Sequence, residues 1–433
     1  MSASDTTTPT RLVTLKLPVW WTFGGLVCGL IAGSLLAGRP FADAVLPFSE
    51  PVGTLWLRAL QMTIIPLVAA LLVLGITQLA SAARAGATAR RMLAFVALAL
   101  VFSGLATIIA MPLLLQAVPP PAGAQSLLAA DVEAQQVPGL SDFFLSLIAP
   151  NIIAAAAETA MLPLTIFFAL FAVAITRLSP EQSAILRSFF EAVANAMLLV
   201  IGWVLWLAPV GVFALALGVA VRAGGDAAFL TLLHYILTVS AMGGIVLVAA
   251  YFVGMLRHGP SSFARAMLPA QAVAISTQSS LASLPAMLAT ARRLGIGENV
   301  ADFVLPLSVA IFRATSPAMN LAVAIYVAHL FGIELSVPAM LAGLAVAFVI
   351  SIGSVSLPGT ISFVVSIGPI ALAMGVPVEP LALLVAVEML PDIMRTLANV
   401  TADVALAGAT DRAAPENGAE NLATDSAPAR SEM

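Results

Sequence analysis

Long apolar stretches are the feature of this sequence that most constrains its fold. Eight segments are apolar over about 20 residues or more, the length that a helix needs to cross a bilayer. They lie at residues 19–38, 54–80, 92–118, 143–176, 188–217, 228–256, 300–332 and 377–408. Hydrophobic residues make up 61% of the 433 residues and charged residues only 9%, whereas soluble domains are about 25% charged. The sequence therefore predicts an all-α polytopic membrane protein with eight transmembrane spans.

The small polar fraction excludes several other classes of protein. The 18 Lys and Arg residues against 22 Asp and Glu residues give a net charge of −4, so the chain has no polybasic surface for nucleic acid. The single cysteine, Cys28, excludes an intramolecular disulfide and a cysteine-based metal centre. The three histidines lie far apart in the sequence. We therefore expect no cofactor, and no nucleophile–base pair indicates an enzyme.

Basic residues predict the orientation, because cytoplasmic loops of membrane proteins are rich in Lys and Arg. Thirteen basic residues fall on one predicted side: Arg11, Lys16, Arg84, Arg90, Arg91, Arg177, Arg187, Arg257, Arg265, Arg292, Arg293, Arg412 and Arg430. Arg39 and Arg222 fall on the other side. We therefore expect an integral protein of the cytoplasmic (inner) membrane with both termini in the cytoplasm. Residues 1–18 are expected to be a cytoplasmic leader rather than a signal peptide, and 409–433 a disordered cytoplasmic tail.

Two further segments do not fit a simple count of crossings. Residues 262–292 are moderately apolar and lie between two basic clusters on the same predicted side, so they must cross an even number of times. They are too short for two crossings and a loop. A re-entrant hairpin with a polar tip at 276–280 satisfies both conditions, because irregular backbone at membrane depth is tolerated where it lines a protein cavity.

Residues 337–375 present the same problem from the opposite side, with a tip at 353–359. Both hairpins contain the sequence Ser-Leu-Pro, at 283–285 and at 356–358. Paired, interrupted segments of this kind indicate a transporter built from inverted repeats. The alternative is that Ser, Gly and Pro only kink two ordinary spans.

One face of the last span carries six polar side chains. At about 100° per residue they fall within an arc of about 100°. They are Glu388, Asp392, Arg395, Thr396, Asn399 and Asp403. Ionisable residues at this depth are costly and indicate a substrate or ion pathway by default. The alternative is that Asp392 and Arg395 form a structural ion pair that ties helices together.

Arg313 is a further intramembrane charge, in the seventh predicted span. It lies too far from the ends of the span to reach the surface, so it needs an anionic partner. Asp392, Asp403 and Glu388 are the candidates, and a purely structural pairing is the alternative. Arg58, near the start of the second span, is expected at the membrane interface.

Several motifs together resemble the dicarboxylate/amino acid:cation symporter family, which is the glutamate-transporter family, over residues 56–403. The strongest is Asp392-x-x-Arg395-Thr396-x-x-Asn399-Val400-x-x-Asp403. The others are residues 57–62 with Pro66, the serine-rich segment 279–285, residues 304–307, and residues 351–353 with Pro358-Gly359.

This resemblance implies an elevator-type transporter, usually a homotrimer. Residues 19–91 and 143–217 would form the scaffold and trimerisation spans. Residues 92–118 and 228–408, with both hairpins, would form the moving transport domain.

The resemblance also implies the substrate-binding residues. Arg395 would bind the distal carboxylate of the substrate, and Asp392 its ammonium group. Independently, a planar guanidinium is the natural bidentate partner of a carboxylate. The other expected substrate-binding residues are Thr396, Asn399 and Ser316, with the backbone around Ser279, Ser280 and Leu357 closing over the substrate.

The seventh span departs from the family pattern. Relatives carry Asn-Met-Asp-Gly-Thr there, whose polar atoms bind sodium, whereas residues 312–316 read Phe-Arg-Ala-Thr-Ser. Arg313 would then supply the positive charge that sodium brings in relatives, balancing Asp403 and Glu388. Asn399 and Asp403 survive as a residual cation site. We therefore expect coupling to a proton, or no coupling, in preference to sodium.

The combined prediction is a secondary active transporter, a symporter, of acidic amino acids or C4-dicarboxylates. Its partners would be the bilayer and a small anionic substrate such as aspartate, glutamate or a C4-dicarboxylate. A dicarboxylate-only carrier is disfavoured, because Asp392 would have no ammonium partner. A transporter-like substrate sensor or a channel is the alternative from another class.

Overall fold

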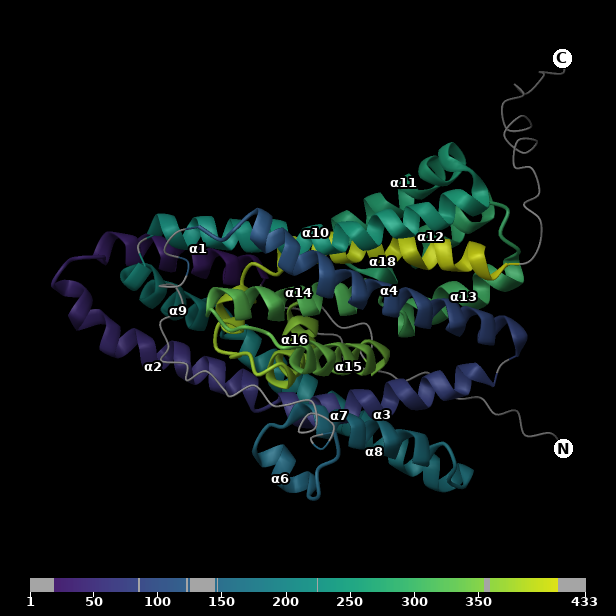
Figure 1. The fold of residues 1–433 in the computed structure, drawn as a ribbon, viewed down its shortest axis with the longest axis horizontal. Helices are drawn as coiled ribbons and strands as arrows, with labels where there is room; N and C mark the ends of the chain where they lie inside the picture. Colours follow the sequence, from purple (N-terminus) through teal and green to yellow (C-terminus); the bar gives the residue numbers. More distant parts are fainter. Residues whose placement is uncertain are drawn as a thin grey trace, which may run out of the picture.

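The computed structural model describes residues 19–84, 86–121, 124, 145, 147–223, 225–353 and 359–411, and within these ranges every regular element is a helix (Figure 1). In chain order the helices are α1 (Val19–Leu36), α2 (Phe41–Gln61), α3 (Ile64–Ala83), α4 (Ala87–Ala117), α6 (Ile152–Ala157), α7 (Met161–Ile175), α8 (Pro180–Trp206), α9 (Ala208–Ala223), α10 (Gly225–His258), α11 (Pro260–Thr277), α12 (Ser280–Arg293), α13 (Glu298–Ile311), α14 (Thr315–Leu330), α15 (Val337–Gly353), α16 (Gly359–Ala373), α17 (Leu381–Leu384) and α18 (Met389–Thr410). The predicted leader 1–18, the tail beyond Asp411 and Leu357 lie outside the described residues.

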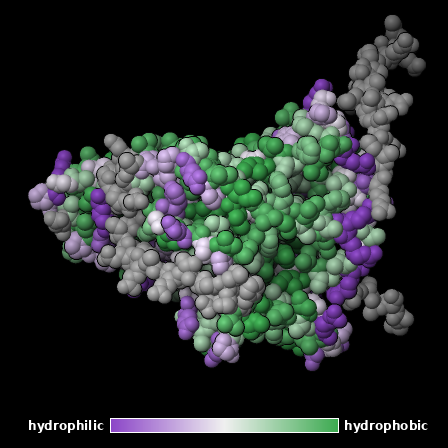
Figure 2. Space-filling view, in the orientation of Figure 1, coloured by the Kyte–Doolittle hydropathy of each residue, from purple (hydrophilic) through white to green (hydrophobic). Residues whose placement is uncertain are grey.

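The all-helical membrane fold expected from composition is present. Within the described ranges, five helical stretches are long and apolar enough to cross a bilayer, and four shorter apolar helices accompany them. Large apolar side chains such as Trp203, Phe252 and Leu256 are exposed on the surface. Figure 2 shows that hydrophobic residues cover the middle of the visible face, while hydrophilic residues gather toward its ends. This distribution suits a protein whose middle is surrounded by lipid.

Two predicted spans differ from the helices observed. The segment 143–176 was expected to be one span, but its helices α6 and α7 are separated by a turn in which Thr159 has a left-handed φ of 55°. The predicted segment 188–217 starts later in the chain than the helix observed there. Ser179 caps the start of α8, and Pro180 occupies its first turn, where proline is favoured. A turn at Leu207 then separates α8 from α9. Because the first turn of α8 is polar, the apolar stretch in the sequence begins later than the helix does.

The last two predicted spans are each interrupted by a break in the helix. The seventh is divided into α13 and α14, with Phe312 extended at φ −109° and ψ 116°. The eighth is divided into α17 and α18, with turns at residues 385–388. Pro317 and Pro391 each stand at the third position of the second half-helix. In a continuous helix each proline ring would clash with the carbonyl four residues earlier, which lies inside the break.

The first predicted hairpin is a pair of packed helices. At 1.5 Å per residue, α11 and α12 are about 27 Å and about 21 Å long, shorter than a hydrocarbon core of about 30 Å, and they pack against each other. Gln278 turns the chain with a left-handed φ of 50°, and the Ser279 side chain accepts a hydrogen bond from Ala282 N at 3.2 Å. The helices α15 and α16 of the second hairpin also pack together. Its predicted tip residues 354–358 lie outside the described residues, so a meeting of the two tips stays a prediction.

The ends of the helices divide as the arginine distribution requires. In Figure 1 the end of α1, the start of α2, the end of α9 and the start of α10 lie toward the left, near Arg39 and Arg222 in the sequence. The end of α3, the start of α4 and the end of α18 lie toward the opposite end. At the left end the side chains of Arg222 and Glu50 form an ion pair. Which end faces the cytoplasm stays a prediction.

Candidate functional site

The polar stripe of the last span lies in the core of the protein. All six of its side chains are buried. Five of them lie on α18, and the sixth, Glu388, is the residue directly before it. Since Glu388 keeps helical backbone angles (φ −58°, ψ −24°), the 100° periodicity extends to it. The predicted stripe is therefore a continuous buried polar face, and it begins at the helix break.

The residues of this stripe are Glu388, Asp392, Arg395, Thr396, Asn399 and Asp403, of which the last five belong to α18.

Arg395 is the centre of this face, and all three of its guanidinium nitrogens have partners. Its Nη2 lies 2.6 Å from Glu388 Oε1, its Nε lies 3.2 Å from Asp392 Oδ1, and its Nη1 donates to Asn320 Oδ1 at 2.9 Å. The side chains of Arg395 and Glu388 are only 7% and 1% exposed. Two carboxylates therefore enclose one guanidinium in a site that water scarcely reaches.

Two residues of this network were not predicted from the sequence. Tyr235 of α10 donates a hydrogen bond from its hydroxyl to Glu388 Oε2 at 3.2 Å. Asn320 of α14 bonds Arg395 through its oxygen, and its Nδ2 donates to Ser316 Oγ at 3.1 Å. Both are buried. A polar Asn in an otherwise apolar span is a signal of a functional position, and it was available one turn after Ser316.

Asn399 links the last span to the break in the seventh. Its Oδ1 accepts hydrogen bonds from the backbone N of Thr315 at 3.0 Å and from the Thr315 hydroxyl at 2.9 Å. Thr315 is the first residue of α14, so Asn399 satisfies one of the N–H groups that a helix start leaves without an intrahelical partner. The oxygen expected to serve a substrate or a cation thus fixes the start of α14 in this structure.

Arg313 lies in the break, beside the acidic residues of the stripe. It is half-buried, and it interacts electrostatically with Asp392 and Asp403 and is repelled by Arg395. Of the three anionic partners considered for it, Glu388 is instead bound to Arg395 and Tyr235. The helix break explains how a charged residue fits here, because extended backbone at Phe312 interrupts the apolar span.

Asp403 is a buried carboxylate near the C-terminal end of the stripe. Among the described residues neither of its oxygens has a hydrogen-bond partner of good geometry. The neighbouring Ser308 hydroxyl donates instead to the carbonyl oxygen of Leu305 at 3.0 Å. A buried carboxylate in this state is costly as an anion unless a proton or a cation joins it.

The first hairpin is joined to the same helix. Gln271 of α11 donates from Nε2 to Thr401 Oγ1 at 2.9 Å and accepts from the Tyr251 hydroxyl at 3.0 Å. Ser279 and Ser280, at the tip, are partly exposed.

Thr396 is buried on α18 next to Arg395. Within the described ranges no group of three or more His, Cys, Asp or Glu residues could hold a metal ion.

An all-helical apolar fold with broken spans and a buried charged network defines a polytopic membrane transport protein. Residues 19–413 match the sodium:dicarboxylate symporter family, so the chain belongs to that family. This confirms the resemblance drawn from the sequence motifs. The protein is therefore a membrane transporter of the symporter class and not an enzyme.

Relatives of this chain include both glutamate and neutral amino acid transporters. It is 28% identical to the proton/sodium-glutamate symport protein of Bacillus caldotenax over 395 residues, covering 88% of this chain and 90% of the relative. It is also 28% identical to the protein of the same description from Bacillus subtilis, covering 88% of each chain. Identity to the human neutral amino acid transporter A is 27%, covering 89% of this chain and 80% of the relative.

Proposed function

We propose that this protein transports acidic amino acids or C4-dicarboxylates across the cytoplasmic membrane, with Arg395 as the anchor for a substrate carboxylate. The observation that carries this proposal is the burial of Arg395 between two carboxylates on a helix that begins at a break. A guanidinium in that setting recognises a planar anion bidentately. The glutamate symport proteins among the relatives support the same substrate class.

The remaining predicted site residues would then bind different groups of the substrate. Asp392 takes the ammonium group of an amino acid, because it carries negative charge one turn from Arg395. Thr396, Asn399 and Ser316 hold other polar groups. The backbone around Ser279, Ser280 and Leu357 closes over the ligand, and the N-terminal ends of half-helices there favour its negative charge.

Glu388 occupies the place that a substrate carboxylate would take on Arg395. Its contact at 2.6 Å is a short, charge-assisted one, so an incoming carboxylate competes with it. Once displaced, a buried Glu388 is costly as an anion and is stabilised by taking up a proton. Substrate binding and proton binding would thereby be linked at one side chain.

This exchange supports proton coupling, or uncoupled transport, in preference to sodium. A hard cation such as sodium needs several oxygen ligands. The oxygen of Asn399 already accepts two hydrogen bonds from Thr315, and Arg313 places a positive charge beside Asp403. The residual cation position formed by Asn399 and Asp403 is thus limited to the Asp403 carboxylate, which a proton also neutralises.

The same reading includes the elevator mechanism and a homotrimer. In support, α1 packs on α9 and α3 packs on α7 and α8, all within the proposed scaffold. Likewise α10 packs on α18, and α4 on α14, within the proposed transport domain. The domain boundaries at 91, 118, 217 and 228 remain part of this proposal.

A second candidate is transport of small neutral amino acids. It is favoured by the same Glu388–Arg395 contact, because an internal carboxylate already neutralises the arginine. The human neutral amino acid transporter A among the relatives points in this direction. A neutral substrate would leave Glu388 in place and need Asp392 for its ammonium group.

Uptake into proteoliposomes tests these alternatives. Labelled aspartate, glutamate, malate, succinate and alanine would be offered with sodium or choline outside, with and without an imposed pH gradient. We expect concentrative uptake of an acidic substrate that needs no sodium. Uptake of alanine alone would favour the second candidate. A steep dependence of uptake on sodium would refute the proposal that Arg313 replaces a bound sodium ion. Binding without uptake would indicate a sensor.

A Glu388→Gln variant sharpens the test. It keeps the size of the side chain but cannot exchange a proton, so we expect the response of uptake to a pH gradient to be lost while exchange of substrate persists. Glu334→Gln, on the loop between α14 and α15, is the control for loss of one carboxylate. An unchanged response to the gradient would remove Glu388 from the coupling mechanism.

A further inference from the structure

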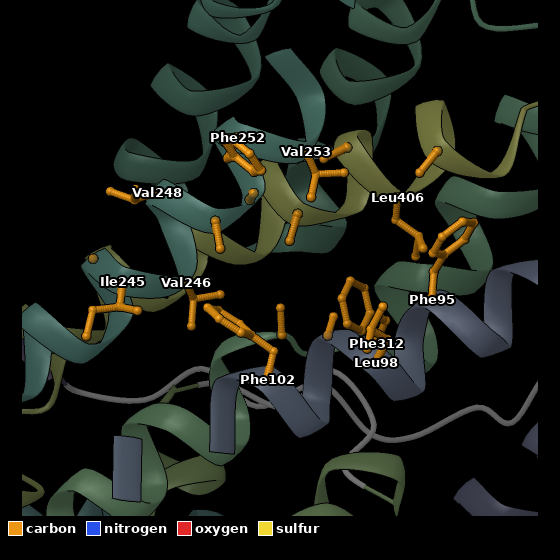
Figure 3. A pocket seen from close by; sticks show the side chains of 18 of the residues that line it. Phe95, Leu98, Phe102, Ile245, Val246, Val248, Phe252, Val253, Phe312 and Leu406 are labelled. Atoms are coloured by element: carbon orange, nitrogen blue, oxygen red, sulfur yellow. The ribbon is translucent and has the colours of Figure 1, made fainter. Parts of the chain in front are cut away.

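An apolar groove of about 870 Å³ lies between α4, α10 and α18, and none of the residues that contact Arg395 lines it (Figure 3). Phe95 and Phe102 of α4 form one wall, and Val253 of α10 stands on the opposite wall. Leu406 of α18 contributes to the floor. Its volume is within the range of about 300–1,000 Å³ that is usual for ligand sites.

The groove opens on the lipid-facing side of the helices. Both α4 and most of α10 belong to stretches long and apolar enough to span the bilayer. Gly244 of α10 lines the groove, and a Cβ added there would meet no heavy atom within 4 Å. At the adjacent Gly243 an added Cβ would lie 2.9 Å from both Met319 Sδ and Met394 Cγ. One side of α10 is thus packed against the core, while the other borders unfilled space at membrane depth.

Two arginines flank the lining residues of α4 and α10, beyond the residues that line the groove itself. Arg91 stands one turn before Phe95 on α4, and Arg257 stands one turn after Val253 on α10, so each continues the groove face of its helix. Arg91 Nη1 donates to the carbonyl oxygen of Thr410 at 3.1 Å, and Arg257 Nη2 donates to that of Asp411 at 3.2 Å. Both guanidinium groups therefore converge on the C-terminal end of α18.

Capping of α18 occupies Nη1 of Arg91 and both Nε and Nη2 of Arg257, whose Nε donates to the carbonyl oxygen of Gly408 at 3.4 Å. A guanidinium has five N–H donors in a fixed fork, so a capping arginine also has the chemistry to bind a phosphate. The groove therefore combines a long apolar channel with a cationic end, which is the pattern of a phospholipid. A free anion would not contact the apolar groove, and a purely apolar molecule would not pair with the arginines.

We propose that this groove binds one anionic glycerophospholipid from the bilayer, with an acyl chain between α4 and α10 and its phosphate against Arg91 and Arg257. Both arginines belong to the set predicted to be cytoplasmic, and basic pockets between helices on that side of a membrane bind anionic head groups. Phe312 and Ala314, on either side of Arg313, also line the groove. The bound chain thus touches the break that carries Arg313.

Native mass spectrometry of the delipidated full-length protein tests this proposal. The probes are phosphatidylglycerol and phosphatidylcholine with the same two acyl chains. We expect wild type to hold one phosphatidylglycerol about 30-fold more tightly than phosphatidylcholine, as two arginines near a membrane surface allow. Arg91→Gln with Arg257→Gln should remove this preference, whereas Arg84→Gln with Arg177→Gln, an equal loss of charge just after α3 and α7, should keep it.

A second variant guards against a folding defect at the arginines. Gly244→Leu adds a large side chain at a position that lines the groove, and its Cβ would meet no heavy atom within 4 Å. It should lower the affinity for both lipids about tenfold or more, while Gly244→Ala should bind nearly as wild type. Equal binding of the two lipids by wild type would overturn the proposal, as would undiminished binding by Gly244→Leu. If glycerol phosphate competes as strongly as the lipid does, the site binds a free anion instead. If the protein is a dimer that Gly244→Leu dissociates, a second copy of the chain covers the groove.

Discussion

In the eighth span the helix break ends at Glu388, whose carboxylate is held by Arg395 and by Tyr235. In the seventh span the break carries Arg313, which is half-buried and balanced electrostatically by Asp392 and Asp403. In both breaks a proline stands at the third position of the following half-helix, where its ring is incompatible with a helical carbonyl four residues earlier. The same backbone device therefore serves two purposes: one break supplies a carboxylate to a closed ion-pair network, and the other supplies a positive charge to a carboxylate that lacks hydrogen bonds.

This difference indicates which charge is tied to folding and which to coupling. Removing a member of the closed network strands a buried charge of opposite sign, so stability and binding should fall together. Removing Arg313 takes a neighbouring positive charge from Asp392 and Asp403 but leaves the three contacts of Arg395 in place. We therefore expect its effect on ion dependence to exceed its effect on stability.

The largest expected effect follows from Arg395→Ala. Binding of acidic substrates should be abolished, and the free energy of unfolding should fall by about 3–5 kcal/mol because Glu388 and Asp392 lose their shared cation. Calorimetric titration with aspartate and thermal unfolding measure the two losses. In Arg395→Ala with Glu388→Gln, part of the stability should return without binding. Wild-type affinity for aspartate or malate in the single variant would end the role of Arg395 as anchor.

Arg313→Met probes the other break. If Arg313 replaces a bound cation, sodium should now stimulate uptake by about 5-fold or more, the scale of ordinary coupling free energies. Uptake into proteoliposomes in sodium against choline measures this ratio, and Arg58→Met is the control for an arginine near a span terminus. A variant that loses substrate affinity in both salts would show that Arg313 binds a substrate carboxylate directly.

A smaller and more selective effect is expected from Asp392→Asn. It removes the proposed partner of the ammonium group, so aspartate should lose about tenfold more affinity than succinate. Competition binding with the two ligands on the same preparation gives the ratio. Equal losses for both ligands would mean that Asp392 serves Arg395 and not the substrate.

The smallest effect is expected from Tyr235→Phe. One hydrogen bond to Glu388 is lost, which costs about 1 kcal/mol. Tyr251→Phe is a matched control, because it loses one hydrogen bond to Gln271 in the first hairpin instead. Only Tyr235→Phe should alter how uptake responds to a pH gradient, and identical responses in the two variants would separate Tyr235 from the proton pathway.

Much of the architecture followed from local patterns in the sequence. Apolar runs indicated the helices, since a chain in lipid must satisfy its own backbone hydrogen bonds. The period of 3.6 residues placed Asp392, Arg395 and Asn399 on one face, and all three are buried. The first hairpin was recoverable from its length and flanks, and the Ser279 cap at its tip is a local signal too. Motifs were enough to indicate the family.

Other features were missed although a local signal existed. Pro317 and Pro391 mark the two helix breaks, and the cap formed by Ser179 and Pro180 marks the start of α8. Apolar length alone is insensitive to these residues, because a broken span is as hydrophobic as a continuous one.

What the sequence by itself determined is that the chain is helical and membrane-embedded, that one face of its last span is polar, and to which family it belongs. Only the tertiary structure decided the partners of the polar residues. Glu388 pairs with Arg395 and not with Arg313, Asn399 binds Thr315 across 84 positions of the chain, and Arg91 reaches Thr410 across 319. The physical reason is that a buried charge requires a partner but periodicity along one helix does not specify it. The choice depends on the packing of helices distant in sequence, which also leaves the groove between α4, α10 and α18.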